Sequence, residues 1–97
     1  MKLYVDTSEP EAVISLQEQE STLAERRFTA DPTLGRQLLE QLDDMLKELG
    51  KAKQDITAID VDPGPGHFMA LRTGIVTAQT LAQALGLPLP KVQPRYE

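Results

Sequence analysis

The sequence contains no cysteine and only one histidine, so several classes of site lack the residues to build them. Without cysteine there is no disulfide framework, no thiolate nucleophile and no cysteine zinc site. The lone His67 argues against a histidine-rich metal centre. An absence of cysteine fits a reducing compartment, and we expect the protein to act in the cytoplasm.

Positive charge is also scarce. Ten lysines and arginines face fifteen acidic residues, which gives a formal net charge of −5. This is the wrong sign for a protein that grips nucleic acid by its phosphates, so any work on RNA is expected to pass through a partner. The opening stretch, MKLYVDTSEP, has no apolar run long enough for a signal peptide or a membrane span. We therefore expect a soluble protein with no membrane partner.

The length of 97 residues predicts one small domain that covers residues 1–97. A chain of this size buries about two thirds of the surface that its unfolded form exposes. Its core is therefore modest, and there is little room for a deep cleft. No internal repeat or low-complexity segment divides the chain.

The first third of the chain favours strands. KLYVD at residues 2–6 is a β-favouring run, and the following TSEP is typical of a turn. Residues 11–29 contain two apolar stretches separated by EQE, which predicts a hairpin. The same segment is rich in Glu, Gln, Leu and Ala, so a helix remains an alternative there.

The clearest helix is predicted over residues 31–50, DPTLGRQLLEQLDDMLKELG. Asp31 suits a capping position, Pro32 suits the first turn, and Gly50 suits the end. Leucines and Met45 form two adjoining seams with spacings of three and four residues. This stripe is wider than contact with a sheet requires, which suggests a second neighbour, although a helix sunk in its own core would show it too.

The second half of the chain repeats the alternation of strand and helix. Residues 56–62, ITAIDVD, predict a strand, and the following PGPG forces a sharp exit. Residues 67–86 predict a second helix that contains small residues suited to close helix packing. LPKVQ at residues 89–93 is a candidate for a last short strand. The predicted fold is α/β, with a mixed sheet of about five strands and two long helices on one face.

Two stretches resemble the TsaB (YeaZ) family, namely LYVDTS at residues 3–8 and DPGPGHFMALRTGIVTAQTLAQALGLPL at residues 62–89. The family pattern for the loop is close to G-R-G-P-G-S-F-T-G-hydrophobic-R-I-G. This chain departs from it at His67, Met69, Ala70 and Thr73. The residues that match are interpreted as a structural loop: Gly64, Pro65, Gly66, Phe68, Arg72 and Gly74.

The resemblance implies a fold, a function and partners. The fold would be the first, ribonuclease-H-like lobe of the actin and sugar-kinase (ASKHA) architecture. Members of the family are noncatalytic relatives of TsaD in the synthesis of tRNA threonylcarbamoyladenosine, so no enzymatic activity, cofactor or metal is expected. They also carry a second lobe, and the chain reads either as a fragment or as a half-sized relative.

The implied partner is a TsaD-like protein, with a TsaE-like ATPase reached through the complex, and the chain alone is expected to form a homodimer. In the family the two helices pair with the equivalent helices of the partner. The expected central contacts are Leu38, Leu42, Met45, Leu71, Ile75 and Ala78.

A competing hypothesis of another class is a small nucleotide- or metal-binding enzyme. Asp6, Asp60 and Asp62 stand near strand ends, where carboxylates hold magnesium in ribonuclease-H-like enzymes. However, the loop after the first strand reads Asp6, Thr7, Ser8, without the glycine that phosphate-binding relatives have there. We therefore interpret PGPG as a corner that seats the second helix rather than as a phosphate cradle, and His67 as a solvent-facing residue of that corner.

Overall fold

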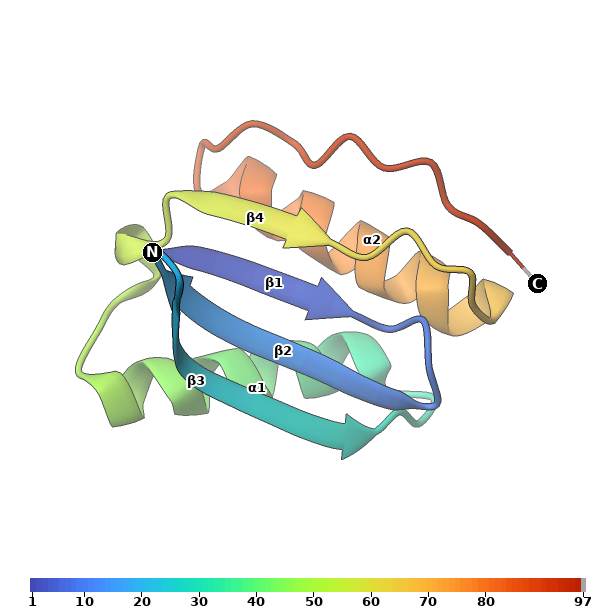
Figure 1. The fold of residues 1–97 in the computed structure, drawn as a ribbon, viewed down its shortest axis with the longest axis horizontal. Coiled ribbons are helices and arrows are strands. Elements are labelled where there is room, and N and C mark those ends of the chain that lie inside the picture. Colours follow the sequence, from blue (N-terminus) through green and yellow to red (C-terminus); the bar gives the residue numbers. More distant parts are fainter. Residues whose placement is uncertain (97) are drawn as a thin grey trace.

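The computed structural model describes residues 1–96 and contains a four-stranded sheet with two α-helices (Figure 1). In chain order the elements are β1 (Lys2–Asp6), β2 (Glu11–Glu18), β3 (Ser21–Thr29), α1 (Leu34–Leu49), a short 3₁₀ turn (Lys53–Asp55), β4 (Ala58–Val61) and α2 (Phe68–Ala84). The mixed α/β architecture predicted from the sequence is confirmed.

The strands lie in the order β3-β2-β1-β4. β1 pairs antiparallel with β2, with Leu3 opposite Leu16, and parallel with β4, with Leu3 opposite Ile59. A parallel neighbour requires a crossover, and α1 supplies it between β3 and β4. Because successive side chains of a strand alternate between faces, these opposed apolar residues all lie on the side that the helices cover.

Residues 11–29 form the predicted hairpin and not a helix. Ala12, Ile14 and Leu16 of β2 are at most 1% exposed, so the alternation of β2 places three apolar side chains in the core. A helix would scatter the same residues around its axis. Burial of this row against β1 and the helices therefore outweighs the helical propensity of the segment.

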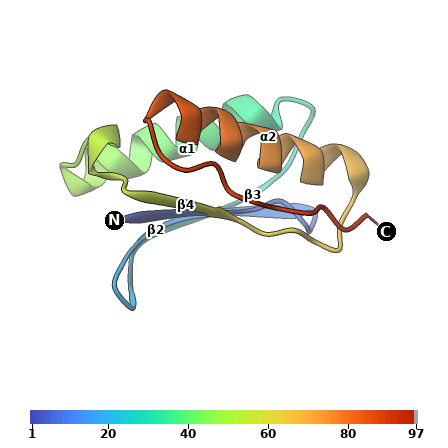
Figure 2. The same cartoon turned by 90° about the horizontal axis from the view of Figure 1, so that it is seen from above.

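Both helices cover one face of the sheet and leave the other face open (Figure 2). α1 ends where Gly50 adopts φ 65°, with the Lys51 amide bonded to the Leu46 carbonyl at 2.9 Å. α2 ends in the same way at Gly86, since the Leu87 amide bonds to the Ala82 carbonyl at 2.9 Å. Within the described part of the chain, no helix is long and apolar enough to cross a membrane.

One of the buried positions of α2 is a glycine, which lets the helix pack directly against the residue that follows β1. A Cβ built on Gly74 would stand 2.2 Å from Oγ1 of Thr7, the residue that follows β1. No side chain fits there without movement of the helix or of Thr7. Thr7 is itself 1% exposed, and its hydroxyl has no hydrogen-bond partner.

The sheet has four strands, one fewer than the approximate count of five that the sequence predicts. The segment predicted at residues 89–93 forms no strand, although the chain runs alongside β4 in both views (Figures 1 and 2). Pro88, Pro90 and Pro94 lack the amide hydrogen that a ladder needs. Within residues 1–96, an isolated bridge between Gly66 and Tyr96 is all that continues the sheet on this side.

Candidate functional site

The loop after β1 closes on itself. One oxygen of the Asp6 carboxylate, Oδ1, accepts hydrogen bonds from the Ser8 amide at 2.9 Å and from the Ser8 hydroxyl at 2.6 Å. This is the geometry of an Asx turn, in which the carboxylate replaces a backbone acceptor. The Ser8 amide and hydroxyl are therefore already engaged within the loop rather than offered to a phosphate.

The PGPG loop after β4 packs tightly between two backbones. A Cβ on Gly66 would lie 2.7 Å from the Ser8 carbonyl oxygen, and one on Gly64 would lie 2.5 Å from the Arg95 carbonyl oxygen. Gly64 also adopts φ 101°, and its amide donates to Asp62 Oδ1 at 2.8 Å. Both glycines are therefore needed for close backbone approach, and Gly64 also for its φ angle.

The remaining residues of the predicted loop set lie around this corner. Pro65 is exposed and follows Gly64 through a cis peptide bond. The rings of Phe68 and Tyr96 meet at a tilt of 52° with their centroids 4.9 Å apart, so the start of α2 contacts the C-terminal segment. Arg72 is exposed on α2.

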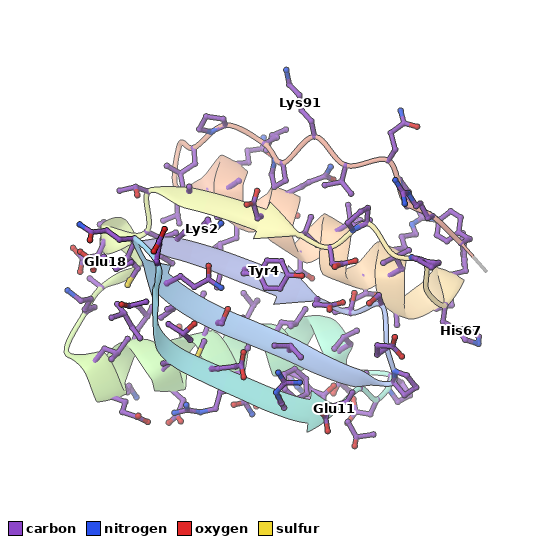
Figure 3. All side chains as sticks on the ribbon, viewed as in Figure 1. Lys2, Tyr4, Glu11, Glu18, His67 and Lys91 are labelled. Atoms are coloured by element: carbon purple, nitrogen blue, oxygen red, sulfur yellow. The ribbon has the colours of Figure 1, made fainter. Side chains whose placement is uncertain are left out.

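Tyr4 lies on the open face of the sheet (Figure 3). The three carboxylates of the competing hypothesis are close enough to raise the pKa of its phenol, but each has its own partner. Asp62 Oδ2 accepts from the Tyr4 hydroxyl at 3.0 Å, and Asp60 pairs with Lys2 at 3.2 Å. Asp6 is held by its own loop. Among the described residues, no three histidine, cysteine or acidic side chains gather to hold a metal ion.

Tyr4 is the residue that these acids affect most. Its burial, its hydrogen bond to Asp62 and the negative charge of Asp62 raise the pKa of the Tyr4 phenol well above its ordinary value. The phenol therefore stays protonated and serves as a hydrogen-bond donor to the loop. The alternation of polar residues along β1 could have signalled this open face, but not the pairing of Tyr4 with Asp62.

His67 is exposed immediately before α2 and points away from the sheet (Figure 3). Its side chain caps no amide of the helix, although its carbonyl accepts from the Leu71 amide at 2.9 Å. It borders a groove of about 640 Å³ that runs between the loops after β1 and β3 and the start of α2. Asp31 borders the same groove, and hydrogen bonds from Thr33 lower the pKa of its carboxyl.

The six residues predicted as central contacts with a partner lie instead in the core of the lobe. Leu38, Leu42, Met45, Leu71 and Ala78 are at most 1% exposed, and Ile75 is 6% exposed. No partner is present to test these contacts, which stay a prediction, but the burial of the six side chains within the lobe argues against it. The seams that contain them face the sheet, so they are already covered before any partner arrives.

The outer surface of the two helices carries a different set of apolar residues. Val76 on α2 is 48% exposed, and Leu39 on α1 is 42% exposed. Leu39 also lines a small space between the two helices and the sheet, together with Thr77 and Leu81. Met69, at the start of α2, is 69% exposed. The apolar stripe of α1 is wider than its contact with the sheet requires. In the structure, Leu39 is the apolar residue of this stripe that stays outside that contact.

The two helices differ sharply in surface charge. Arg72 is the only charged residue of α2, so the helix has none from Thr73 to its end at Ala84. α1 carries charges along its exposed side, and these pair locally, as Arg36 does with Glu40 at 3.4 Å. Arg26 of β3 likewise pairs with Asp44 and Glu48 of α1. The uncharged outer side of α2, with Leu39 beside it, is called the α2 surface below.

Comparison with known proteins places these features in context. A family model described as "TsaD: tRNA N6-adenosine threonylcarbamoyltransferase" matches residues 29–94. The tRNA threonylcarbamoyladenosine biosynthesis protein TsaB of Bacillus subtilis is 29% identical over 90 residues, which are 93% of this chain and 39% of that protein. A tRNA N6-adenosine threonylcarbamoyltransferase of Streptococcus pneumoniae is 44% identical over 48 residues, which are 50% of this chain and 14% of that enzyme.

Solved structures agree with the sequence matches. YeaZ from Pseudomonas aeruginosa superposes with a TM-score of 0.81 at 28% identity, over 96% of this chain and 43% of that one. A second structure, of a protein with similarity to peptidase YEAZ from the same organism, gives a TM-score of 0.81 at 29% identity and covers 95% of this chain and 42% of that one. The chain therefore spans about two fifths of the length of these relatives.

Proposed function

This chain belongs to the TsaB (YeaZ) branch of the family whose model is named for TsaD, and on that premise we propose that it is a noncatalytic interaction subunit in the biosynthesis of tRNA threonylcarbamoyladenosine. It pairs through the α2 surface with a TsaD-type protein or with a second copy of itself. This chain interacts with a TsaE-type ATPase through that complex. The site of action is the cytoplasm, and the chain makes no direct contact with nucleic acid.

The observation that carries this proposal is the uncharged α2 surface. The exposed side of a helix in contact with water usually carries charged residues, as α1 does here. The centres of protein interfaces are depleted in charge and contain apolar anchors. Val76 of α2 and Leu39 of α1 offer two such anchors, and each is less than half exposed. They lie beside a stretch of α2, Thr73 to Ala84, that has no charged side chain.

The partner is inferred from the same surface. Two helices that lie side by side on one face of a sheet present a broad and shallow ridge, which suits a second pair of helices. A TsaD-type partner is proposed because this chain matches the TsaD family model and a tRNA N6-adenosine threonylcarbamoyltransferase of Streptococcus pneumoniae, so the partner would present a related pair of helices. A second copy presents an identical uncharged ridge, so a symmetric dimer is also chemically matched.

A noncatalytic role is supported because the carboxylates of the loops after β1 and β4 already accept hydrogen bonds from neighbouring groups of this chain. The Asp6 carboxylate is engaged with Ser8, and Asp62 is engaged with Gly64 and Tyr4. A formal charge of −5 adds repulsion toward tRNA and nucleotide phosphates. Activity in the complex is therefore assigned to the partner.

The test is a charge placed on the α2 surface. Val76→Asp should leave the circular dichroism spectrum unchanged, because the side chain at this position is half exposed. It should weaken self-association of the chain, or its binding to a TsaD-type partner, about a hundredfold or more, since an unpaired buried charge costs about 3 kcal/mol. Sedimentation velocity measures the first interaction and calorimetry the second.

Two controls make the result specific. Thr22→Asp adds the same charge at an exposed site of the hairpin, away from the helices, and should leave association unchanged. Leu38→Asp and Leu39→Asp compare adjacent residues of α1. The first should unfold the protein because Leu38 is 1% exposed, whereas the second should only weaken association. If the wild type remains monomeric at high concentration and does not bind a TsaD-type protein, the proposal fails.

A further inference from the structure

Arg72 of α2 is an exposed arginine that forms no ion pair with any other residue of the described chain 1–96. By contrast, Arg26, Arg27 and Arg36 each pair with at least one acidic side chain. Arg72 is therefore a cation on the helical side of the lobe that no described carboxylate neutralises.

Arg72 lies among the exposed apolar residues of α2. Met69 precedes it by three residues and Val76 follows it by four, and these spacings place side chains on the same side of a helix. Met69 is 69% exposed and Val76 is 48% exposed. Four residues advance a helix by about 6 Å, whereas a partner that buries a typical area of about 800 Å² covers a patch about 30 Å across. A partner centred on Val76 therefore also covers Arg72.

An arginine that a partner covers needs an acceptor for its hydrogen bonds. Removal of a guanidinium from water is strongly unfavourable unless a carboxylate pairs with it. The planar fork of N–H donors fits both oxygens of a carboxylate at once. Arginine is also among the residues that contribute most to the affinity of protein interfaces. The chemistry of Arg72 therefore requires a carboxylate on the partner, opposite this point of α2.

The helices of a second copy have no free carboxylate for this role. α2 has no acidic residue, and all the acidic residues of α1 pair within their own chain. Glu40 pairs with Arg36, Asp43 pairs with Lys53, and both Asp44 and Glu48 pair with Arg26. A helix of a second copy could pair with Arg72 only by giving up one of these contacts, which would take a carboxylate from another cation.

We propose that Arg72 is the residue by which the α2 surface selects its partner: it pairs with a carboxylate on the helices of a different protein and so favours that protein over a second copy. The inference rests on the proposed function, because it takes the α2 surface as the interface. It narrows that function to a complex with a TsaD-type protein that presents a free aspartate or glutamate opposite Arg72. The apolar contacts of Val76 and Leu39 suit either partner, whereas the charge of Arg72 distinguishes between them.

The test compares Arg72→Gln with the wild type, using the full chain and the TsaD-type protein of the same organism. Because Arg72 is exposed, the circular dichroism spectrum should be unchanged. Calorimetry should show binding weakened about tenfold or more, since the carboxylate of the partner would be covered without its counter-charge. Self-association, measured by sedimentation velocity, should be no weaker than that of the wild type.

Two further variants separate a direct ion pair from a structural role. Arg72→Lys keeps the charge but not the fork of donors, so it should lose less affinity than Arg72→Gln. Arg72→Glu should prevent binding. When the exposed acidic residues on the partner's helices are replaced by arginine one at a time, one replacement should restore binding to Arg72→Glu. A residue that only supported the fold of α2 would not show this rescue.

Arg27→Gln is the matched control, because it removes the same charge from another exposed arginine. Its neighbour Arg26 contacts α1, so alternation along β3 places Arg27 on the open face, away from the helices. This control should bind as the wild type does. Equal binding of Arg72→Gln and the wild type, or an equal loss in Arg27→Gln, would overturn the inference.

The same measurements separate this inference from the proposed function. If the wild type binds the TsaD-type protein, Val76→Asp prevents binding and Arg72→Gln does not weaken it, the α2 surface is the interface and only the role of Arg72 is refuted. A wild type that binds no TsaD-type protein refutes the heterotypic complex itself. Weaker self-association of Arg72→Gln would show that a second copy also pairs with Arg72, which contradicts the selection proposed.

Discussion

Gly74→Ala would place a methyl group where α2 contacts Thr7. The added Cβ would lie 2.2 Å from Thr7 Oγ1, 2.8 Å from Cγ2 and 3.0 Å from Cβ. Nonbonded carbon atoms prefer about 3.5–4.0 Å, so Thr7 must rotate and the helix must also lift by roughly 1 Å. Rotation alone does not relieve the contact, because the Cβ of Thr7 stays in place.

Two opposing terms set the size of the effect. Overpacking of a core costs about 1–3 kcal/mol, while removal of a glycine from a helix interior gains about 0.5–1 kcal/mol. We therefore expect Gly74→Ala to lower the free energy of unfolding by about 1–2 kcal/mol, measured by urea denaturation with circular dichroism. For a lobe with a small core this is a substantial fraction of the total stability.

Two further variants separate steric conflict from other causes. Gly35→Ala in α1 meets only Thr77 Oγ1 at 3.6 Å and Thr73 Cγ2 at 3.8 Å, which is ordinary contact, so it should be neutral or stabilising by up to about 1 kcal/mol. Thr7→Ala combined with Gly74→Ala removes the two closest atoms and should recover about 1–2 kcal/mol relative to the sum of the single variants. A Gly74→Ala protein as stable as the wild type, or strict additivity in the double variant, would refute the reasoning.

Two other predictions concern single polar groups. Thr7→Val keeps the shape of the side chain but removes a buried hydroxyl without a partner, so it should raise the free energy of unfolding by about 1 kcal/mol in the same urea assay; a loss would mean that the hydroxyl is bonded in solution. The pKa of Tyr4 is raised in the folded protein, so the neutral phenol contributes to stability. This contribution is fully present below pH about 10, the ordinary pKa of tyrosine, and is lost as the pH rises through the higher pKa of the folded state. The stability difference between the wild type and Tyr4→Phe should therefore be constant near neutral pH and shrink only in strong alkali, and a change near pH 7 would contradict the assignment.

Sequence patterns predicted several local elements correctly. The two apolar stretches of residues 11–29 predicted a hairpin against a competing helical propensity, and the pairing of β2 with β3 confirmed the hairpin. The glycines at 50 and 86 ended the helices as predicted, because their positive φ angles let the chain turn back on the last carbonyls. The match of residues 3–8 and 62–89 to a known family also held over nearly the whole chain.

A fifth strand is absent because the prolines of the last segment outweigh its β-favouring residues. LPKVQ contains β-favouring valine and leucine, but prolines at 88, 90 and 94 remove alternate amides. The sequence therefore already contained the evidence against a fifth strand. Only the structure shows that the segment nevertheless lies along β4 and is fastened at Arg95.

The sequence by itself determined which residues of each helix are apolar and how they are spaced, because periodicity depends only on the order of residues. It could not determine which seam faces the sheet, since that depends on how the helices are placed by elements distant in the chain. Tertiary packing buried Leu38 and Leu42 and left Leu39 and Val76 outside. It likewise brought Gly74 of α2 against Thr7 after β1, a contact between residues 67 positions apart that no local pattern encodes.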